Sequence, residues 1–204
     1  MTTTTATPVP HDPRPATAGD LEGVAATLAA AFLDDPVMAW CYPQPRRRGA
    51  ILPALFRRLA EAYLPHGGIQ TAPGHEAAAI WIPMPAEVDD GSLATDLERI
   101  SGEDAGRLFA LLEILEAHHP GHAAHRYLMA IGTRPASQGT GIGSRMLAAV
   151  LDACDADGTP AYLEATTPRN RRLYERHGFA VTDLLTLPGG PEIACMWRPP
   201  RAGS

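Results

Sequence analysis

Six residues, Gln138-Gly139-Thr140-Gly141-Ile142-Gly143, form a glycine-rich turn between an apolar run at 127–131 and a helical pattern. Such a turn at a helix N-terminus exposes backbone N–H groups, which can bind phosphate oxygens. The dinucleotide fingerprint GxGxxG fails because position 144 is Ser, and a Walker loop fails because the chain contains no lysine. The turn therefore favours a diphosphate held by main-chain amides, with a flexible entry into the helix as the alternative.

A carboxylic acid and a phenol follow this turn. Glu164 interrupts an otherwise apolar strand pattern, where burial would raise its pKa toward that of a general base. The alternatives for Glu164 are the solvent face of the strand or an ion pair with a nearby arginine. Tyr174 would be protonated at neutral pH and could give its proton to a thiolate, or it could be a core aromatic residue. Asn170 lies one helical turn earlier on the same face, where it could bind a ligand or cap the helix.

These residues resemble two motifs of the GNAT superfamily of acetyltransferases. Gln138-x-x-Gly141-x-Gly143 matches Q/R-x-x-G-x-G/A, and the stretch from Tyr174 to Phe179 looks like Y-E-x-x-G-F. Three further segments resemble the puromycin N-acetyltransferase-like branch: Leu163-Glu164-Ala165-Thr166, Pro168-Arg169-Asn170 and Cys195-Met196-Trp197-Arg198-Pro199-Pro200. The resemblance covers residues 14–200 and is strongest from residue 127 onward.

The resemblance implies an α/β fold, with a mixed α+β sheet flanked by helices and splayed central strands. Strand four would carry a bulge and part from strand five, and acetyl-CoA would lie in that gap as the cosubstrate, with no metal. The implied coenzyme-binding residues come from strand four, the glycine turn and the later helix: Ala130, Ile131, Gly132, Thr133, Gln138, Gly139, Thr140, Gly141, Ile142, Gly143, Ser144 and Asn170. Many members carry Arg or Lys at the position of Thr140, so Arg134 or Arg145 would have to supply a cationic contact.

The implied activity is transfer of an acetyl group from acetyl-CoA to a primary amine of a small molecule, by direct attack in a ternary complex. Glu164 would be the base, Tyr174 the acid, and a backbone N–H near residues 131–133 would meet the oxyanion. The branch suggests an antibiotic-like or amino-nucleoside acceptor. The alternatives are a protein or peptide N-acetyltransferase, a non-catalytic acyl-CoA-binding sensor and, less closely, a nicotinamide-dependent enzyme.

Apolar periodicity predicts the elements that position these residues. Asp20 is expected to cap the first helix, Asp34-Asp35-Pro36 to end it, and the acidic stretch 86–104 to be loop-like with one helical turn at most. The expected strands lie at 14–17, 69–72, 77–82, 127–133, 161–166, 179–187 and 192–198. The expected helices lie at 20–33, 45–64, 106–118, 141–156 and 168–177.

Composition indicates a globular chain, since 45% of the 204 residues are hydrophobic and 20% are charged. We expect one domain at 14–200 between disordered tails at 1–13 and 201–204. The net charge of −6 disfavours nucleic acid as a partner. The longest apolar run, Val24 to Leu33, is too short to span a membrane, and residues 1–13 do not resemble a signal peptide. Three scattered cysteines favour a reducing, cytoplasmic location, and a homodimer stays open.

Three other groups have both a functional and a structural interpretation. Four histidines have the spacing HH-x-x-H-x-x-H (His118, His119, His122, His125). A metal site is disfavoured because Pro120-Gly121 breaks the helix that would align them. His118 and His119 would cap that helix, and His125 could approach the acceptor. The basic stretch would be a solvated helix face or a contact for the adenosine phosphate (Arg46, Arg47, Arg48, Arg57, Arg58). Acids beside aromatic rings would form a wall for a cationic aromatic amine, or simply a helix end with core aromatics (Asp34, Asp35, Trp40, Tyr42).

Overall fold

The computed structural model describes residues 12–86, 91–121 and 123–201. Its main elements are β1 Arg14–Pro15, α1 Leu21–Phe32, α2 Pro36–Cys41, α3 Pro45–Tyr63, β2 Ile69–Thr71, β3 Ala77–Met84, α4 Leu93–Ser101, α5 Ala105–His118, β4 His125–Thr133, α6 Ile142–Asp157, β5 Ala161–Ala165, α7 Pro168–Arg176, β6 Ala180–Thr186 and β7 Glu192–Arg198. The expected tails fall largely outside the described residues. Arg201, which the sequence assigns to a tail, donates its backbone N–H to Asp155.

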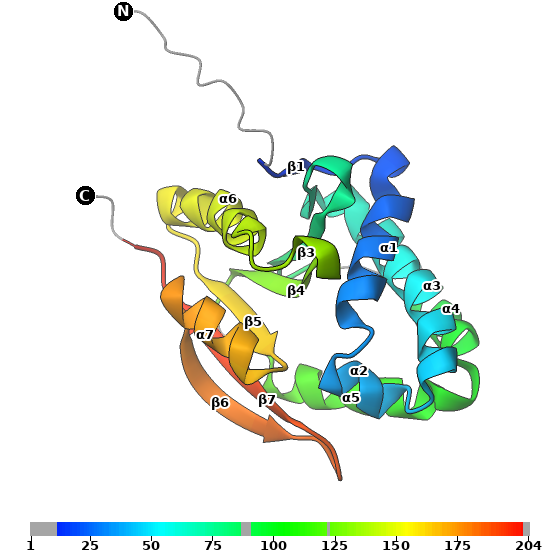
Figure 1. Cartoon of the computed structure of the whole chain (residues 1–204). Helices are drawn as coiled ribbons and strands as arrows, with labels where there is room; N and C mark the ends of the chain where they lie inside the picture. Colours follow the sequence, from blue (N-terminus) through cyan, green and yellow to red (C-terminus); the bar gives the residue numbers. More distant parts are fainter. Residues whose placement is uncertain (1–11, 87–90, 122, 202–204) are drawn as a thin grey trace, which may run out of the picture.

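The strands form one mixed sheet in the order β1-β2-β3-β4-β5-β7-β6. The β4–β5 pair is parallel, and the other described pairs are antiparallel. Helices cover both faces of the sheet (Figure 1). The predicted fold class, a mixed sheet flanked by helices, is therefore confirmed.

The sheet opens between β4 and β5. In the β3–β4 register Ile80 lies opposite Ala130 while Trp81 lies opposite Leu128, so Met129 is the extra residue of a bulge in β4. The β4–β5 register ends at the pair Leu128–Leu163. Beyond that pair the two strands diverge, which confirms the predicted bulge and splay.

Each face of the sheet packs against its own hydrophobic core. Side chains of α1, α3 and α5 form one core with strand residues such as Ile80 and Tyr162. Side chains of α6 and α7 form the other with strand residues such as Trp81 and Leu163. Because successive strand residues point to opposite faces, Glu164 shares the α1–α3–α5 face with Tyr162, whereas α7 covers the opposite face.

Two helices differ from the sequence prediction. Asp34-Asp35-Pro36 was expected only to end a helix, but Asp35 caps α2 and Pro36 occupies its first turn, a position where the missing N–H is harmless. The stretch at 86–104 was expected to be mostly loop; its residues 87–90 lie outside the described set, and α4 occupies Leu93–Ser101. Asp20 does not cap α1 with its side chain, and its carboxylate instead accepts hydrogen bonds from the N–H and hydroxyl of Thr17.

The basic stretch belongs to α3, whose arginines mostly hold neighbouring elements together. Arg47 pairs with Glu103 and Asp104, and Arg58 pairs with Asp96 of α4. Arg48 is buried and donates to the carbonyl oxygens of Leu33 and Tyr42, which corrects the expectation of a solvated face at that position. In the part of the chain that the structure covers, no helix has both the length and the apolar character that crossing a bilayer requires.

Candidate active site

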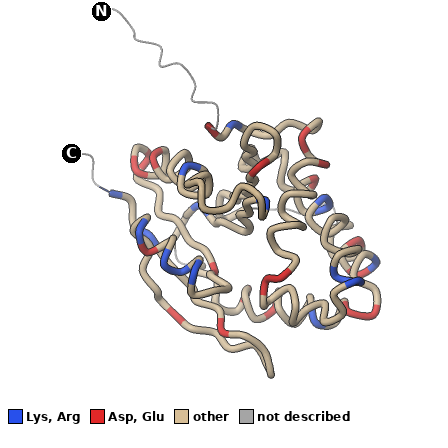
Figure 2. The backbone as a smooth tube through the Cα atoms, in the orientation of Figure 1, with Lys and Arg blue, Asp and Glu red and all other residues tan. Residues whose placement is uncertain are grey.

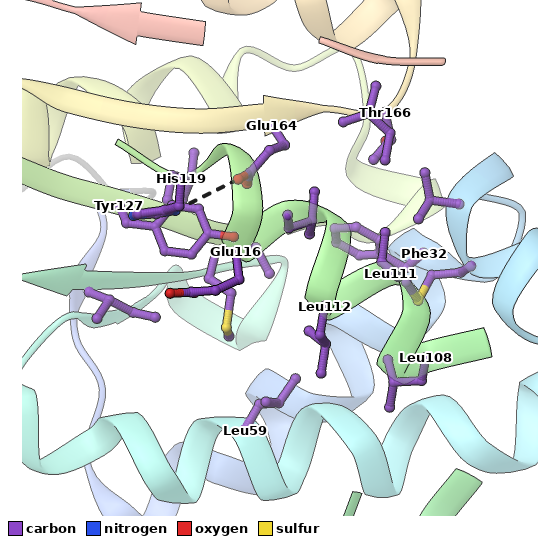
Figure 3. Close-up of a pocket in the computed structure, with 18 of the residues that line it drawn as sticks. Phe32, Leu59, Leu108, Leu111, Leu112, Glu116, His119, Tyr127, Glu164 and Thr166 are labelled. Atoms are coloured by element: carbon purple, nitrogen blue, oxygen red, sulfur yellow. Dashed lines mark ion pairs between the residues drawn. The ribbon is translucent and has the colours of Figure 1, made fainter. Parts of the chain in front are cut away.

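A cavity of about 850 Å³ lies where β4 and β5 part. Residues of α1 to α5 contribute to its walls, together with β3, β4, β5 and α7. Figure 3 shows Glu164, His119 and Tyr127 at one part of the cavity and leucines of α3 and α5 at another. The predicted pair Glu164 and Tyr174 both line this cavity.

Glu164 lies buried in the cavity wall, with 7% of its side chain exposed. Burial raises its pKa to about 7, and the neighbouring phenols of Tyr127 and Tyr162 oppose part of that rise. Its Oε1 atom is buried and has no hydrogen-bond partner among the described residues. The two alternatives, a solvent-facing side chain and an ion pair with an arginine, are therefore wrong for this residue.

His119 lies beside Glu164, with 4.0 Å between its Nδ1 and the Oε1 of the carboxylate. The ring packs edge-on against Tyr127 and Tyr162, and its Nε2 lies 3.1 Å from the Nε2 of His125. Burial and the neighbouring His125 lower the pKa of His119, which favours a neutral ring at pH 7. At 4.0 Å the two groups are not hydrogen-bonded, and a neutral imidazole in this position could exchange a proton with the carboxyl group through a water molecule.

The sequence did not single out His119 for the site. The expectation that both histidines cap α5 holds for His118, whose Nδ1 lies 2.8 Å from the Ile114 carbonyl oxygen. It is wrong for the His119 side chain, because an extended backbone at His119 turns that ring toward the sheet. His122 of the proposed metal spacing lies outside the described residues. In the described ranges no group of three or more His, Cys, Asp or Glu side chains could hold a metal ion.

Tyr174 reaches the cavity from the opposite face of the sheet. Its ring belongs to the α6–α7 core and also lines the cavity through the parting of the strands. Burial and the nearby charge of Asp35 raise its pKa, so the phenol keeps its proton at neutral pH. The site thus combines a carboxyl group from one face of the sheet with a phenol from the other.

Asn170 also lines the cavity, one helical turn before Tyr174. Thr167 is the N-cap of α7, and its hydroxyl oxygen accepts a hydrogen bond from the Asn170 backbone N–H. The helix-cap alternative for Asn170 is therefore wrong. The Asn170 side chain instead lines the cavity together with Tyr174.

Asp35 is the only member of the expected acid and aromatic wall that lines the cavity among the described residues. Its carboxylate accepts hydrogen bonds from the backbone N–H groups of Val37 and Met38 and from the Thr166 hydroxyl. Trp40 donates to the Pro188 carbonyl oxygen, and the Tyr42 hydroxyl bonds that of Ser101, so these rings serve other contacts. The helix-end interpretation holds, and Asp35 additionally ties α2 to the end of β5.

The expected coenzyme-binding residues of β4 differ in position. Ala130 and Ile131 line the cavity, whereas Gly132 and Thr133 continue the strand away from it. A Cβ atom on Gly132 would lie 2.6 Å from the Cβ of Ala31, so α1 can approach β4 only because this residue is glycine. The close packing of α1 on β4 therefore explains a glycine at position 132, whether or not this residue also contacts a ligand.

The glycine turn joins the end of β4 to α6 and lies outside the cavity lining. Gly139 and Gly141 have φ values of 80° and 81°, a left-handed conformation that other residues adopt with strain. Gly141 is the N-cap and provides no side-chain hydrogen bond, so the N–H groups of the first turn, including Ile142, Gly143 and Ser144, have no intrahelical acceptor. A helix N-terminus with uncapped N–H groups is an arrangement that can bind an anion.

Two arginines lie near the turn. Arg145 follows it on α6, and its Nη1 would lie 3.7 Å from a Cβ built on Gly141. Arg169 belongs to the basic run of α7, visible in Figure 2, and its Nη1 lies 3.5 Å from the Gln138 Oε1. Arg134 donates to the hydroxyl of Thr27 of α1. Arg145 and Arg169 are thus the better-placed cations, and the sequence had not considered Arg169.

Comparisons with known proteins agree with this geometry. The profile of the Acetyltransferase (GNAT) family matches residues 73–179. An uncharacterized N-acetyltransferase of Schizosaccharomyces pombe is 28% identical over an alignment of 184 residues, which covers 83% of this chain and 74% of that protein. A Corynebacterium glutamicum structure, described as histone acetyltransferase HPA2 and related acetyltransferase, is 30% identical with a TM-score of 0.72, covering 95% of this chain and 98% of that one.

A more distant structure shares the fold. The polyamine N-acetyltransferase of Drosophila melanogaster is 17% identical, with a TM-score of 0.68 over 93% of this chain and 99% of that one. The profile match spans more than half of the chain, so this protein belongs to the GNAT family of acetyltransferases.

Proposed function

We propose that the protein is an acetyl-CoA-dependent N-acetyltransferase that modifies a primary amine of a small molecule. The observation that carries this proposal is that Glu164 and Tyr174 line one cavity at the parting of β4 and β5. Acyl transfer to an amine needs a proton acceptor for the nucleophile and a proton donor for the leaving thiolate. A carboxyl group with a pKa of about 7 and a neutral phenol are suited to these two tasks.

The residues fit acetyl-CoA, which supplies a thioester carbon open to attack. The β4 edge beyond Leu128 is not paired with β5 and leads into the turn at the start of α6, where the first N–H groups have no intrahelical acceptor. A Cβ atom on Gly143 would meet only the Thr133 hydroxyl oxygen, at 3.7 Å, so the described protein atoms leave room beside this turn. We assign the diphosphate to residues 138–144, and the pantetheine arm to residues 130–133 with Asn170.

The proton steps follow from the same positions. Ionised Glu164 would take a proton from the incoming ammonium group, directly or through water, and the neutral amine would attack the carbonyl carbon. Tyr174 would give its proton to the sulfur as the carbon–sulfur bond breaks, and the second proton that the nitrogen loses would restore the phenol. The products are the amide and free thiol, and the proton taken by Glu164 passes to solvent. Holding amine and thioester in contact contributes a large further share of the rate.

A concave cavity of about 850 Å³ supports a small-molecule acceptor, because pockets of this shape and volume are typical of small ligands, whereas a protein acceptor needs a long groove for its chain. The branch resemblance favours an antibiotic-like amine or an amino-nucleoside. The name of the Corynebacterium structure makes a histone-type lysine peptide a useful comparison. The three cysteines are free and buried, which agrees with the proposed reducing, cytoplasmic location.

The test is thiol release from acetyl-CoA with a panel of amines and peptides. We expect turnover with small amines and a fall in kcat of roughly 10²-fold in Tyr174→Phe. Tyr42→Phe is the matched control, since this buried phenol lies outside the cavity lining. Tight CoA binding without turnover of any amine would favour the sensor instead, and turnover of peptides alone would favour the protein acetyltransferase.

A further inference from the structure

Beyond Glu164 and Tyr174 the cavity continues between α3 and α5. Both helices present apolar side chains to this space: Leu55, Leu59 and Tyr63 from α3, and Leu108, Leu111 and Leu112 from α5. In Figure 3, Leu59, Leu108 and Leu112 gather in one region of the cavity, apart from Glu164. A volume of about 850 Å³ lies in the range of pockets that bury drug-sized ligands. The pantetheine arm assigned above would take the part beside Ala130, Ile131 and Asn170, and the space between α3 and α5 would remain for the acceptor.

Leu112 marks this wall as a contact surface. Its neighbours Leu108 and Leu111 are buried at 5% and 4% exposure, whereas Leu112 is 40% exposed. All three side chains line the cavity, so Leu112 offers apolar surface to this space that its neighbours do not cover. A large apolar side chain left uncovered in a concave site favours an apolar ligand.

Every charged residue in the described lining other than a histidine is acidic. Asp35 already accepts three hydrogen bonds, and exposed Glu113 and Glu116 stand at the rim, where they attract cations over a distance. Glu164 alone combines burial with an oxygen that has no partner among the described residues. This oxygen is therefore the place for the ammonium group.

We propose that the acceptor is a hydrophobic amine with a single cationic nitrogen, bound with the nitrogen beside Glu164 and the apolar body between α3 and α5. This assignment rests on the function proposed above. An acceptor bearing a carboxylate or phosphate would find no arginine in the described lining. A peptide would have to bury its amides against leucine side chains, which is unfavourable without hydrogen-bond partners.

Straight-chain amines test this assignment because their length and charge vary separately. From butylamine to octylamine, kcat/KM should rise about two- to fourfold for each added methylene, as expected for burial of CH₂ groups. Hexylamine should exceed both 1,6-diaminohexane and 6-aminohexanoate, which match its length and add a charge, by at least about tenfold. A flat series, or preference for the diamine or a lysine peptide, would overturn the assignment.

Leu112→Glu places a carboxylate in the apolar wall between α3 and α5. It should lower kcat/KM for octylamine at least about tenfold, raise the relative activity toward 1,6-diaminohexane and leave the KM for acetyl-CoA unchanged. Leu184→Glu is the matched control, since Leu184 is 46% exposed on β6 and is not part of the lining. Equal effects of the two substitutions would count against the proposal.

Calorimetry separates this assignment from the proposed chemistry. With CoA in place of acetyl-CoA, the protein should bind octylamine more tightly than 1,6-diaminohexane. Tighter binding of octylamine without any turnover would support the hydrophobic amine site and contradict the proposed catalytic activity. Turnover with a preference for diamines or peptides would retain the chemistry and overturn the hydrophobic acceptor, as would failure of every alkylamine to bind.

Discussion

Glu164 is a carboxylic acid in a position where its ionised form is unfavourable. Because burial holds its pKa at about 7, the group is only part ionised at neutral pH, which suits reversible proton transfer. We expect kcat/KM to rise with pH as this carboxyl group loses its proton and to level off above about pH 7. Glu164→Gln should lose this limb of the pH profile and roughly 10²–10⁴-fold in kcat/KM.

The control for this profile is Glu175→Gln, which changes an exposed residue of α7 that pairs with Arg171. Its profile should match that of the wild type. The neighbouring His119 has a lowered pKa, so its own titration falls at more acidic pH. An unchanged limb in Glu164→Gln would assign the titration to another group.

The same residue makes a prediction about stability. Its folded-state pKa of about 7 exceeds the ordinary value of 4.5, so the stabilising contribution is complete below pH 4.5 and is lost as pH rises through 7. The loss is up to about 3 kcal/mol at 1.36 kcal/mol per pKa unit. Glu164→Gln should therefore melt a few degrees above the wild type at pH 8, with a smaller difference at pH 4.5. A lower melting temperature at pH 8 would speak against a buried, unpaired carboxylate.

At the scale of single residues, the sequence predicts Glu164, Tyr174 and Asn170 because each departs from its local pattern or matches a motif. It does not predict His119. Two adjacent histidines at a helix end look like capping residues, and only the backbone turn at residue 119 separates their roles. The same limit applies to Arg169, whose approach to Gln138 depends on how α7 packs beside the glycine turn.

Among the elements, α1 and β4 are held unusually close at Gly132. Gly132→Ala would place a methyl group 2.6 Å from the Ala31 Cβ, so α1 or β4 must shift. We expect a loss of about 1–3 kcal/mol in the free energy of unfolding, measured with urea. The double variant Gly132→Ala with Ala31→Gly should recover part of this lost stability, because it removes the methyl group that clashes. The recovery is reduced by about 1 kcal/mol, the cost of a glycine inside helix α1. Additive losses would show that this contact does not set the spacing.

The start of α2 depends on Asp35. Asp35→Ala removes the acceptor of two backbone N–H groups and should lower stability by about 1–2 kcal/mol. Asp35→Asn keeps an acceptor oxygen for the cap of α2, so it should retain most of the stability. The KM for the amine should change by no more than severalfold, because the Asp35 carboxylate caps α2 and is not expected to bind the amine. Thermal melts and kinetics of both variants check this. A selective loss of amine binding in Asp35→Asn would instead assign Asp35 to the acceptor.

Most elements follow from periodicity, and the two that did not have identifiable reasons. At α2 the sequence interpretation treated Pro36 as a terminator, although Pro after an Asp cap also begins helices. At α4 the acidic composition concealed the spacing of Leu93, Leu97 and Ile100, which is typical of an amphipathic helix. Both helices contribute to the cavity, so the acceptor wall was the part of the site that the sequence described least well.

For the whole molecule, the central feature is one sheet between two hydrophobic cores. The opening between β4 and β5 lets residues of both faces meet in one cavity. Glu164 comes from the α5 side (Figure 3) and Tyr174 comes from α7. The motif resemblance predicted the opening, but the residues that surround it on the acceptor side are brought together only by long-range packing. Local patterns carry no information about such packing.

The most direct measurement is a crystal structure of the protein with CoA and octylamine bound. We predict the CoA sulfur within about 3.5 Å of the Tyr174 hydroxyl, the amine nitrogen beside Glu164, and the alkyl chain between α3 and α5. A coenzyme bound with its sulfur outside the parting of β4 and β5, or remote from Tyr174, would contradict it.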